Sequence, residues 1–235
     1  MKKYLLYALG EVVLVIVGIL IALQINNANQ DRIRADQEKK LFEQIESDLQ
    51  SNLADVEDLL DKYEVSSNSA DSLLKSFRTK EKVTSFAAHV SIIHRRFFFT
   101  VASSGYSQLG SSMGNVVQNS ELRNKITQIY EGDFVEIQRK QEMLFDHLQQ
   151  NLMPLSNRLF SIKFRVEFKI SGFDDEPMDF YDPLNFDELM LNTEYANTIA
   201  TQKRLYTYQV SELKKTQSNI RALLKDLEEE IQSED

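Results

Sequence analysis

One apolar run near the start of the chain differs from everything that follows it. From Tyr4 to Ile25 the sequence reads YLLYALGEVVLVIVGILIALQI, and Glu11 is its only charged residue. As an α-helix this run is about 33 Å long, which matches a bilayer hydrocarbon core of about 30 Å. The pattern predicts a single transmembrane helix. A cleaved secretory signal is the alternative, but the run is longer than a usual signal core, a carboxylate interrupts it, and no clear small-x-small site follows Ala22.

The residues that flank the run predict its orientation. Lys2 and Lys3 precede Tyr4 and Tyr7, whose rings suit an interfacial aromatic belt. By the positive-inside rule, the first three residues lie in the cytoplasm and the rest of the chain lies outside it. Two arginines beyond the run weaken this bias.

Glu11 defines a candidate interaction face. A charged group at membrane depth costs about 2.5–3.5 kcal/mol on insertion scales, so we expect it to face protein or water. Gly18 and Ala22 lie on nearly the same helix face and form a small-x-x-x-small pattern that permits close helix approach. This face is expected to contact another transmembrane helix, from a second copy or a different protein. Alternatively, Glu11 lies close enough to the cytoplasmic boundary for protonation or water to lower its cost.

Two later stretches repeat apolar residues in steps of three and four, which predicts long helices that each bury one seam. The first extends from about Asp31 to Phe77, with VSSNSADS as a candidate bend, and the second from about Thr193 to Gln232. The first seam comprises Phe42, Ile45, Leu49, Val56, Leu59, Tyr63, Ala70, Leu73 and Phe77, with Asn52 and Ser66 in its gaps. The second comprises Ile199, Tyr206, Val210, Leu213, Ile220, Leu224, Leu227 and Ile231, interrupted by Lys203 and Gln217.

The middle of the chain predicts at least two further helices. Thr84 is a candidate cap for one that includes Phe97, and Asn119 or Ser120 for another that kinks or ends at Pro154. Residues 162–170, IKFRVEFKI, alternate apolar and charged side chains, which is typical of a strand. This segment pairs with the loop that follows it, augments a sheet on another chain, or is helix or coil.

These elements predict an all-α fold. Only 7 Gly and 3 Pro occur in 235 residues, which favours long helices. Residues 1–29 form a cytoplasmic stub, a transmembrane anchor and a polar collar. Residues 30–235 form an elongated antiparallel helical bundle, coiled-coil-like in its seams, with at most a short strand or hairpin near 162–170. An even number of long helices would return the C-terminus toward the bilayer.

The composition offers little chemistry. A formal net charge of -9 without a basic stripe argues against nucleic acid and anionic headgroups as partners. The absence of cysteine excludes disulfides and thiolate metal sites. No catalytic motif is present, and the acidic residues between Asp174 and Asp182 lack EF-hand spacing, which favours a solvated loop. We therefore expect no enzymatic activity, no cofactor and no metal.

The N-terminal run also carries a resemblance. KYLLYALGEVVLVIVGILIALQINNAN, from Lys3 to Asn29, resembles the N-terminal signature of an uncharacterised family of small bacterial single-anchor membrane proteins. Ala28 stands where that family usually has Trp, and a looser similarity covers Ser104 to Glu131. The resemblance implies an anchor in a bacterial envelope and implies no activity.

Three function classes follow from these patterns. The first is a bacterial inner-membrane protein whose periplasmic bundle acts as an interaction, sensor or scaffold module through a partner's membrane helix. The second is a homo-oligomer whose Glu11 residues line a proton or cation path, although no second polar residue shares that face through the outer leaflet. The third, an envelope enzyme, has no supporting set of residues. The expected partners are the lipid bilayer and another transmembrane helix.

Overall fold

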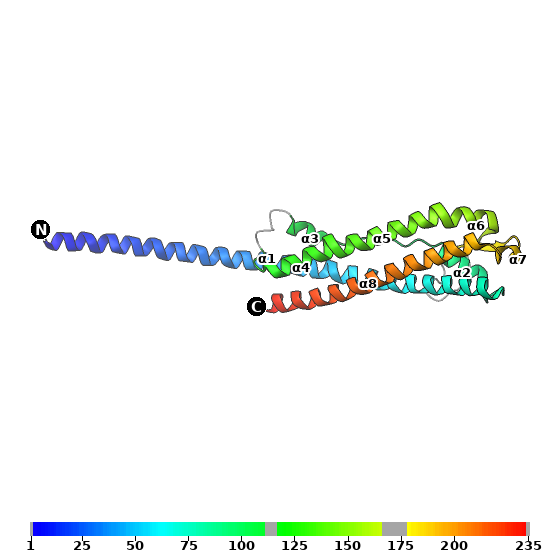
Figure 1. The fold of residues 1–235 in the computed structure, drawn as a ribbon. Helices are drawn as coiled ribbons and strands as arrows, with labels where there is room; N and C mark the ends of the chain where they lie inside the picture. The colour runs from blue at the N-terminus through cyan, green and yellow to red at the C-terminus, as the bar shows by residue number, and fades with distance from the viewer. Residues whose placement is uncertain (1, 111–116, 166–177, 234–235) are drawn as a thin grey trace.

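The computed structural model describes residues 2–110, 117–165 and 178–233 of the chain (Figure 1). Its first element, α1 (Lys2–Thr79), is one uninterrupted helix of 78 residues, about 115 Å long. The predicted bend at VSSNSADS is absent, since the helix continues through this stretch. The Ser66 and Ser72 hydroxyls donate to backbone carbonyls one turn back. The predicted membrane run and the first seam therefore belong to the same helix.

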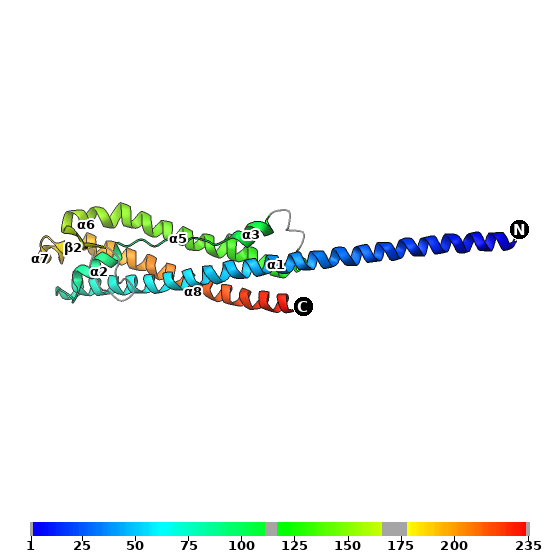
Figure 2. The same ribbon diagram turned by 180° about the vertical axis from the view of Figure 1, so that it is seen from behind.

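The remaining elements form an elongated bundle around the second part of α1. They are α2 (Phe86–Ile93), α3 (Ser104–Leu109), α4 (Ser120–Thr127), the π-helical turn η2 (Gln128–Asp133), α5 (Phe134–His147), the π-helical turn η3 (Leu148–Leu152), α6 (Met153–Leu159), β1 (Phe160–Arg165), β2 (Met178–Pro183), α7 (Phe186–Leu189) and α8 (Thr193–Ser233). From α4 to α6 the chain is one continuous rod (Figure 1). Helix α8 runs antiparallel to α1, and the C-terminus returns to the end of the bundle where α1 leaves it (Figure 2). The predicted all-α fold with a short hairpin is confirmed.

The segment that follows α2 is extended and not helical. Helix α2 ends at Ile93, and residues 95–103, here called the strap, have no regular secondary structure. Phe97 and Phe99 are 7% and 5% exposed while Phe98 is 70% exposed, the two-residue alternation of an extended chain. The prediction that Phe97 continues a helix is therefore wrong. The Thr84 cap is also wrong, because α2 begins after Ser85, which has a left-handed backbone and no side-chain cap.

Polar side chains of two helices hold the strap in place. The Asn52 amide pairs with both backbone groups of Ala102, at 2.8 Å each. The Gln141 amide oxygen accepts from Phe99 N at 3.2 Å. An extended strap has no helical hydrogen bonds of its own, so its buried backbone groups need such partners. This need explains why Asn52 interrupts the apolar seam.

Helix α3 meets α1 at very close range. The Asp48 carboxylate accepts from the Ser104 hydroxyl and from Gly105 N, at 2.8 Å and 2.7 Å, so α1 supplies the cap that Ser103 does not. A Cβ on Gly105 would lie 2.8 Å from the backbone nitrogen of Ile45. Glycine is therefore required at this contact.

The two predicted seams have different outcomes. All nine apolar seam positions of α1 are buried, as predicted. In α8 the central positions between the large apolar residues are Gln202, Gln209, Thr216 and Leu223, whereas Val210, Leu224 and Ile231 are only partly buried. The predicted α8 seam is therefore displaced by one residue at alternate positions. Residues three positions and four positions after each large apolar residue lie on either side of the same line along the helix. Which of the two is buried therefore depends on how α8 packs against its neighbours.

The distal end contains the hairpin. Strands β1 and β2 pair antiparallel, with Ile162 opposite Tyr181. The local-hairpin prediction is confirmed for residues 162–165, whereas 166–170 lie outside the described residues. Pro154 does not end the rod: it lies in the first turn of α6, directly after the π-helical turn η3, and the helix continues to Leu159. The Asn119 cap is confirmed, since its side chain accepts from Leu122 N.

Candidate functional site

The first part of α1 lies outside the bundle. Every described side chain from Gly10 to Arg34 is exposed, and Glu38 is the first buried residue. Between Val13 and Ile25 the exposed surface is almost entirely aliphatic. Within the described residues this is the one helix long and apolar enough to cross a membrane, and none of its apolar window is buried in the protein. A core helix would be covered by its own chain, so this segment differs from the core helices of the bundle and could span a membrane.

The predicted interaction face is not used by the chain itself. Glu11, Gly18 and Ala22 are all exposed, and a Cβ built on Gly18 meets no described atom within 4 Å. Lys2 and Lys3 begin α1 and are followed by Tyr4 and Tyr7, but their side chains lie outside the described ones. The chain thus supplies no partner for Glu11 among its described residues. The assignment of this face to another helix remains a prediction.

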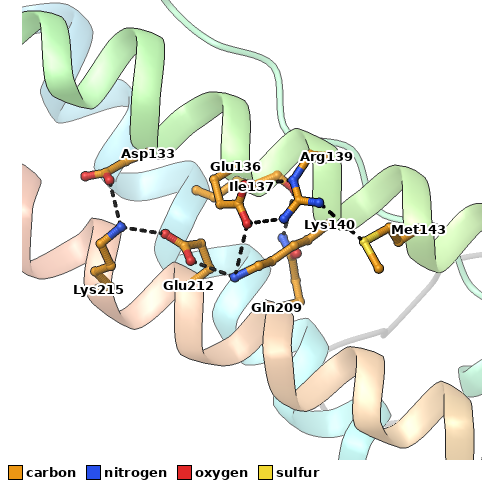
Figure 3. A network of polar contacts seen from close by, with 9 residues as sticks. All are labelled: Asp133, Glu136, Ile137, Arg139, Lys140, Met143, Gln209, Glu212 and Lys215. Atoms are coloured by element: carbon orange, nitrogen blue, oxygen red, sulfur yellow. Dashed lines mark hydrogen bonds and ion pairs between the residues drawn. The ribbon is translucent and has the colours of Figure 1, made fainter.

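A chain of charged side chains joins the rod to α8 (Figure 3). Lys140 contacts Glu136 at 3.7 Å and Glu212 at 2.6 Å, and Lys215 contacts Glu212 and Asp133 at 3.0 Å each. Burial raises the pKa of Glu212, but hydrogen bonds from the two lysines outweigh it and hold that pKa below its usual range. With each of these carboxylates paired to an ammonium group, the cluster acts as a clamp and offers no reactive base.

One end of this clamp is buried. The Asp133 side chain, in η2, is 2% exposed and accepts from Lys215 at 3.0 Å and from Asn219 at 2.7 Å. A buried carboxylate needs such partners, because an unpaired one is costly to keep charged. Asp133 therefore fixes the position of α8 against the π-helical turn.

Next to Asp133 a groove of about 570 Å³ opens between α4, η2 and α8. Ile129 and Leu223 are among its lining residues, and Lys125 bridges Glu121 and Asp226 across it, at 2.9 Å and 3.0 Å. The described residues contain no group of three or more acidic or histidine side chains arranged for a metal ion. The acidic residues 174–176 of the predicted solvated loop lie outside the described residues.

The distal end contains a Ser–His contact that no sequence motif indicated. His94 Nδ1 lies 2.7 Å from Val90 O, which can only accept, so Nδ1 carries the proton and Nε2 accepts from the Ser156 hydroxyl at 2.8 Å. Burial lowers the pKa of His94 to about 4, so the ring is neutral near pH 7. Tyr181 stacks on it with ring centroids 4.3 Å apart.

This pair has the contact distance of a nucleophile and its base. Ser156, however, is 0% exposed and does not line the groove beside Asp133. A reacting hydroxyl must reach a substrate, and this one is sealed between α2, α6 and the hairpin. The contact joins these elements at the distal end. Sequence reasoning missed it because His94 and Ser156 are 62 residues apart.

Comparison with known proteins places the chain in a family. Residues 11–166 match the model of a family of unknown function, DUF6090. The match starts at Glu11 and ends one residue beyond β1, so it covers most of the membrane run, the strap and the rod but not α8. Comparison with curated proteins and with solved structures gives no match. Since the family model covers more than half of its length, the chain belongs to the DUF6090 family.

Proposed function

We propose that this chain is a membrane-anchored interaction module that acts through a partner's transmembrane helix. In this proposal α1 crosses a bacterial inner membrane with its N-terminus in the cytoplasm, and the bundle lies in the periplasm as a sensor or scaffold. The partner helix packs against the face formed by Glu11, Gly18 and Ala22. The observation that carries the proposal is the continuity of α1 from this face into the core of the bundle.

A continuous helix couples the two ends mechanically. Within the bundle α1 packs against α2, α3 and α8, so a ligand or protein that moves these elements acts directly on α1. No loop or glycine interrupts α1 between Gly18 and Thr79. A tilt or rotation of the bundled part is therefore passed to the membrane part without a hinge to absorb it.

The chemistry of the membrane face suits a helix as the ligand. Glu11 lies about 10 Å inside the Tyr4 end of the apolar run, deep enough for its carboxyl group to gain from a donor on a neighbouring helix. Gly18 and Ala22 leave room for the backbone of that helix to come close. A polar anchor beside two small residues gives both affinity and register.

The proposal is tested by crosslinking the tagged full chain in native membranes and identifying the captured proteins by mass spectrometry. Glu11→Gln and Gly18→Leu are expected to lose a protein that the wild type captures. Val13→Leu is the matched control, because Val13 is exposed on the opposite helix face and should retain that protein. Capture of the same proteins by the wild type and all three variants would refute the role of this face.

The same preparations separate the homo-oligomeric alternative. Native mass spectrometry that finds only copies of this chain, together with liposome proton flux lost in Glu11→Gln, would replace the partner-helix proposal with a conduit. A heteromeric complex without flux agrees with the proposal. A monomer whose captured proteins do not depend on Glu11 contradicts both functions.

A further inference from the structure

Between the apolar run and the bundle, α1 stands alone. This segment, residues 26–37, is here called the neck and is about 18 Å long. All its side chains except that of Ala35 are exposed, and no helix or strand of the described chain runs alongside it (Figure 1). A helix of this length is only marginally stable by itself in water, so the neck gains more from a neighbouring helix than the bundled part of α1 does.

One face of the neck continues the membrane face of α1. Successive residues of an α-helix are about 100° apart around its axis. Counted around the axis from Asn29, the residues within about 40° include Glu11, Gly18, Ala22, Ile25 and Ile33. Ile33 is 48% exposed and is the only large aliphatic residue of the neck. The membrane face therefore extends beyond the bilayer as Ile25, Asn29 and Ile33, here called the neck face.

The bundle packs on the opposite side of α1. Where α1 enters the bundle, Glu38, Phe42 and Ile45 are among the first buried residues, and they lie about 140–180° around the axis from Asn29. The residues that prolong the neck face into the bundle are instead exposed, and they are Lys40, Glu43 and Ser47. A helix that lies on the neck face therefore meets no obstruction from the bundle.

Charge favours a different protein over a second copy as the occupant of this face. Two copies inserted with the same orientation set Glu11 against Glu11 at one depth in the bilayer, where two carboxylates cannot both stay charged without a large cost. Each copy also carries a formal net charge of -9, so their bundles repel each other. A helix of another protein can instead place a hydrogen-bond donor opposite Glu11 and aliphatic side chains opposite Ile25 and Ile33.

We propose that the partner's transmembrane helix does not end at the bilayer but continues as a helix along the neck face, at least as far as Ile33. The partner is then a different protein with an extracytoplasmic helical extension, aliphatic opposite Ile25 and Ile33 and hydrogen-bonding opposite Asn29. This inference rests on the proposed function and adds a contact about 12 Å long outside the bilayer. The contact holds the partner against α1 directly below the bundle, so a movement of the bundle reaches the partner before it reaches the membrane.

Photocrosslinking from the full chain in native membranes tests the extension. The photoreactive residue p-benzoylphenylalanine replaces Val15, Ile33 or Asp31 in three separate chains, and all three positions are exposed. Val15 and Ile33 lie at the same angle around α1, inside and outside the membrane, whereas Asp31 is the control about 160° away from Ile33. The same protein should be captured from Val15 and Ile33 and not from Asp31. Mass spectrometry should place the two attachment points about eighteen residues apart in the partner, because both helices rise equally per residue.

A matched pair of variants measures the contribution of the neck. With the photoreactive residue at Val15, Ile33→Asn should lower the yield of captured partner by about fivefold, the loss expected for one partly exposed isoleucine. Ala28→Asn, exposed on the flank of the neck about 100° from Asn29, should leave the yield unchanged. Neither residue contacts the bundle core, so both variants should unfold at the wild-type urea midpoint.

The outcomes separate this inference from the proposed function. Capture from Val15 but not from Ile33, equal capture from Ile33 and Asp31, or attachment points more than one helical turn from the expected spacing would overturn the extension and leave the membrane contact standing. Capture of only further copies of this chain at Ile33 would overturn the choice of a different protein. No capture from Val15 would contradict the proposed function itself, and the extension would fall with it.

Discussion

Replacing Asn52 with leucine separates two interpretations of the α1 seam. The repeat alone marks Asn52 as a polar defect, so leucine should fill the seam and stabilise the bundle by about 1–2 kcal/mol. The structure predicts the opposite sign, because the Asn52 amide bonds both backbone groups of Ala102.

The magnitude follows from those two contacts. Loss of two hydrogen bonds to a partly buried backbone costs about 1–3 kcal/mol. Both amide atoms lie 2.8 Å from their partners, whereas a carbon atom needs about 3.3–3.6 Å, so leucine also pushes the strap outward at about 1–3 kcal/mol. After subtraction of the gain from burying leucine, the middle of these ranges is a destabilisation of about 2–3 kcal/mol for Asn52→Leu.

Two measurements check this value. Urea unfolding of the full chain in detergent, followed by circular dichroism, should give a lower midpoint for Asn52→Leu, and hydrogen exchange should become faster in residues 96–103. Gln209→Leu is the matched control, a core amide whose oxygen has no described partner, and it should not lower the midpoint. A midpoint for Asn52→Leu at or above that of the wild type would refute the assignment of Asn52 to the strap.

Two further predictions concern close packing and pH. Gly105→Ala should destabilise the protein by about 1–3 kcal/mol, because the added Cβ meets the Ile45 backbone. Gly132→Ala is the control and should be tolerated, because its added Cβ meets only the end of a flexible glutamine side chain. Equal urea midpoints for the two variants would contradict the close contact at Gly105. Burial lowers the pKa of His94 to about 4 from an ordinary value of 6.5. As the pH falls, the unfolded chain therefore binds a proton at this histidine before the folded chain does. The free energy of unfolding should decrease between about pH 6.5 and pH 4, by at most about 3 kcal/mol. Unfolding midpoints across this range should fall less steeply in His94→Gln than in the wild type, and parallel curves would assign the loss to other groups.

The helical parts of the fold could be predicted because their signals are local. Apolar residues spaced by three and four positions must share a helix face, so the α1 seam follows from the sequence alone. The Asn119 cap needs only residues three apart. The same applies to the membrane run, where length and apolarity suffice to identify a helix that can span a bilayer.

The parts that failed depend on contacts between distant segments. Nothing local distinguishes a helix from a strap at residues 95–103, because the extended form is stabilised by Asn52 and Gln141, which lie 50 and 42 residues away from the groups they bond. The α8 seam failed similarly, since residues three and four apart flank one line and only neighbouring helices select between them.

The sequence by itself thus determined that the chain has a membrane-competent helix, a carboxylate on one face of it and long helices beyond it. Only the tertiary structure decided that the membrane helix and the bundle core are one unbroken helix, that the chain is extended at Phe97 where a helix was predicted, and that α8 buries Gln202, Gln209 and Thr216 in its seam. The physical reason is that helical periodicity is set within a few residues, whereas burial of a polar group is decided by which partners the folded chain brings to it.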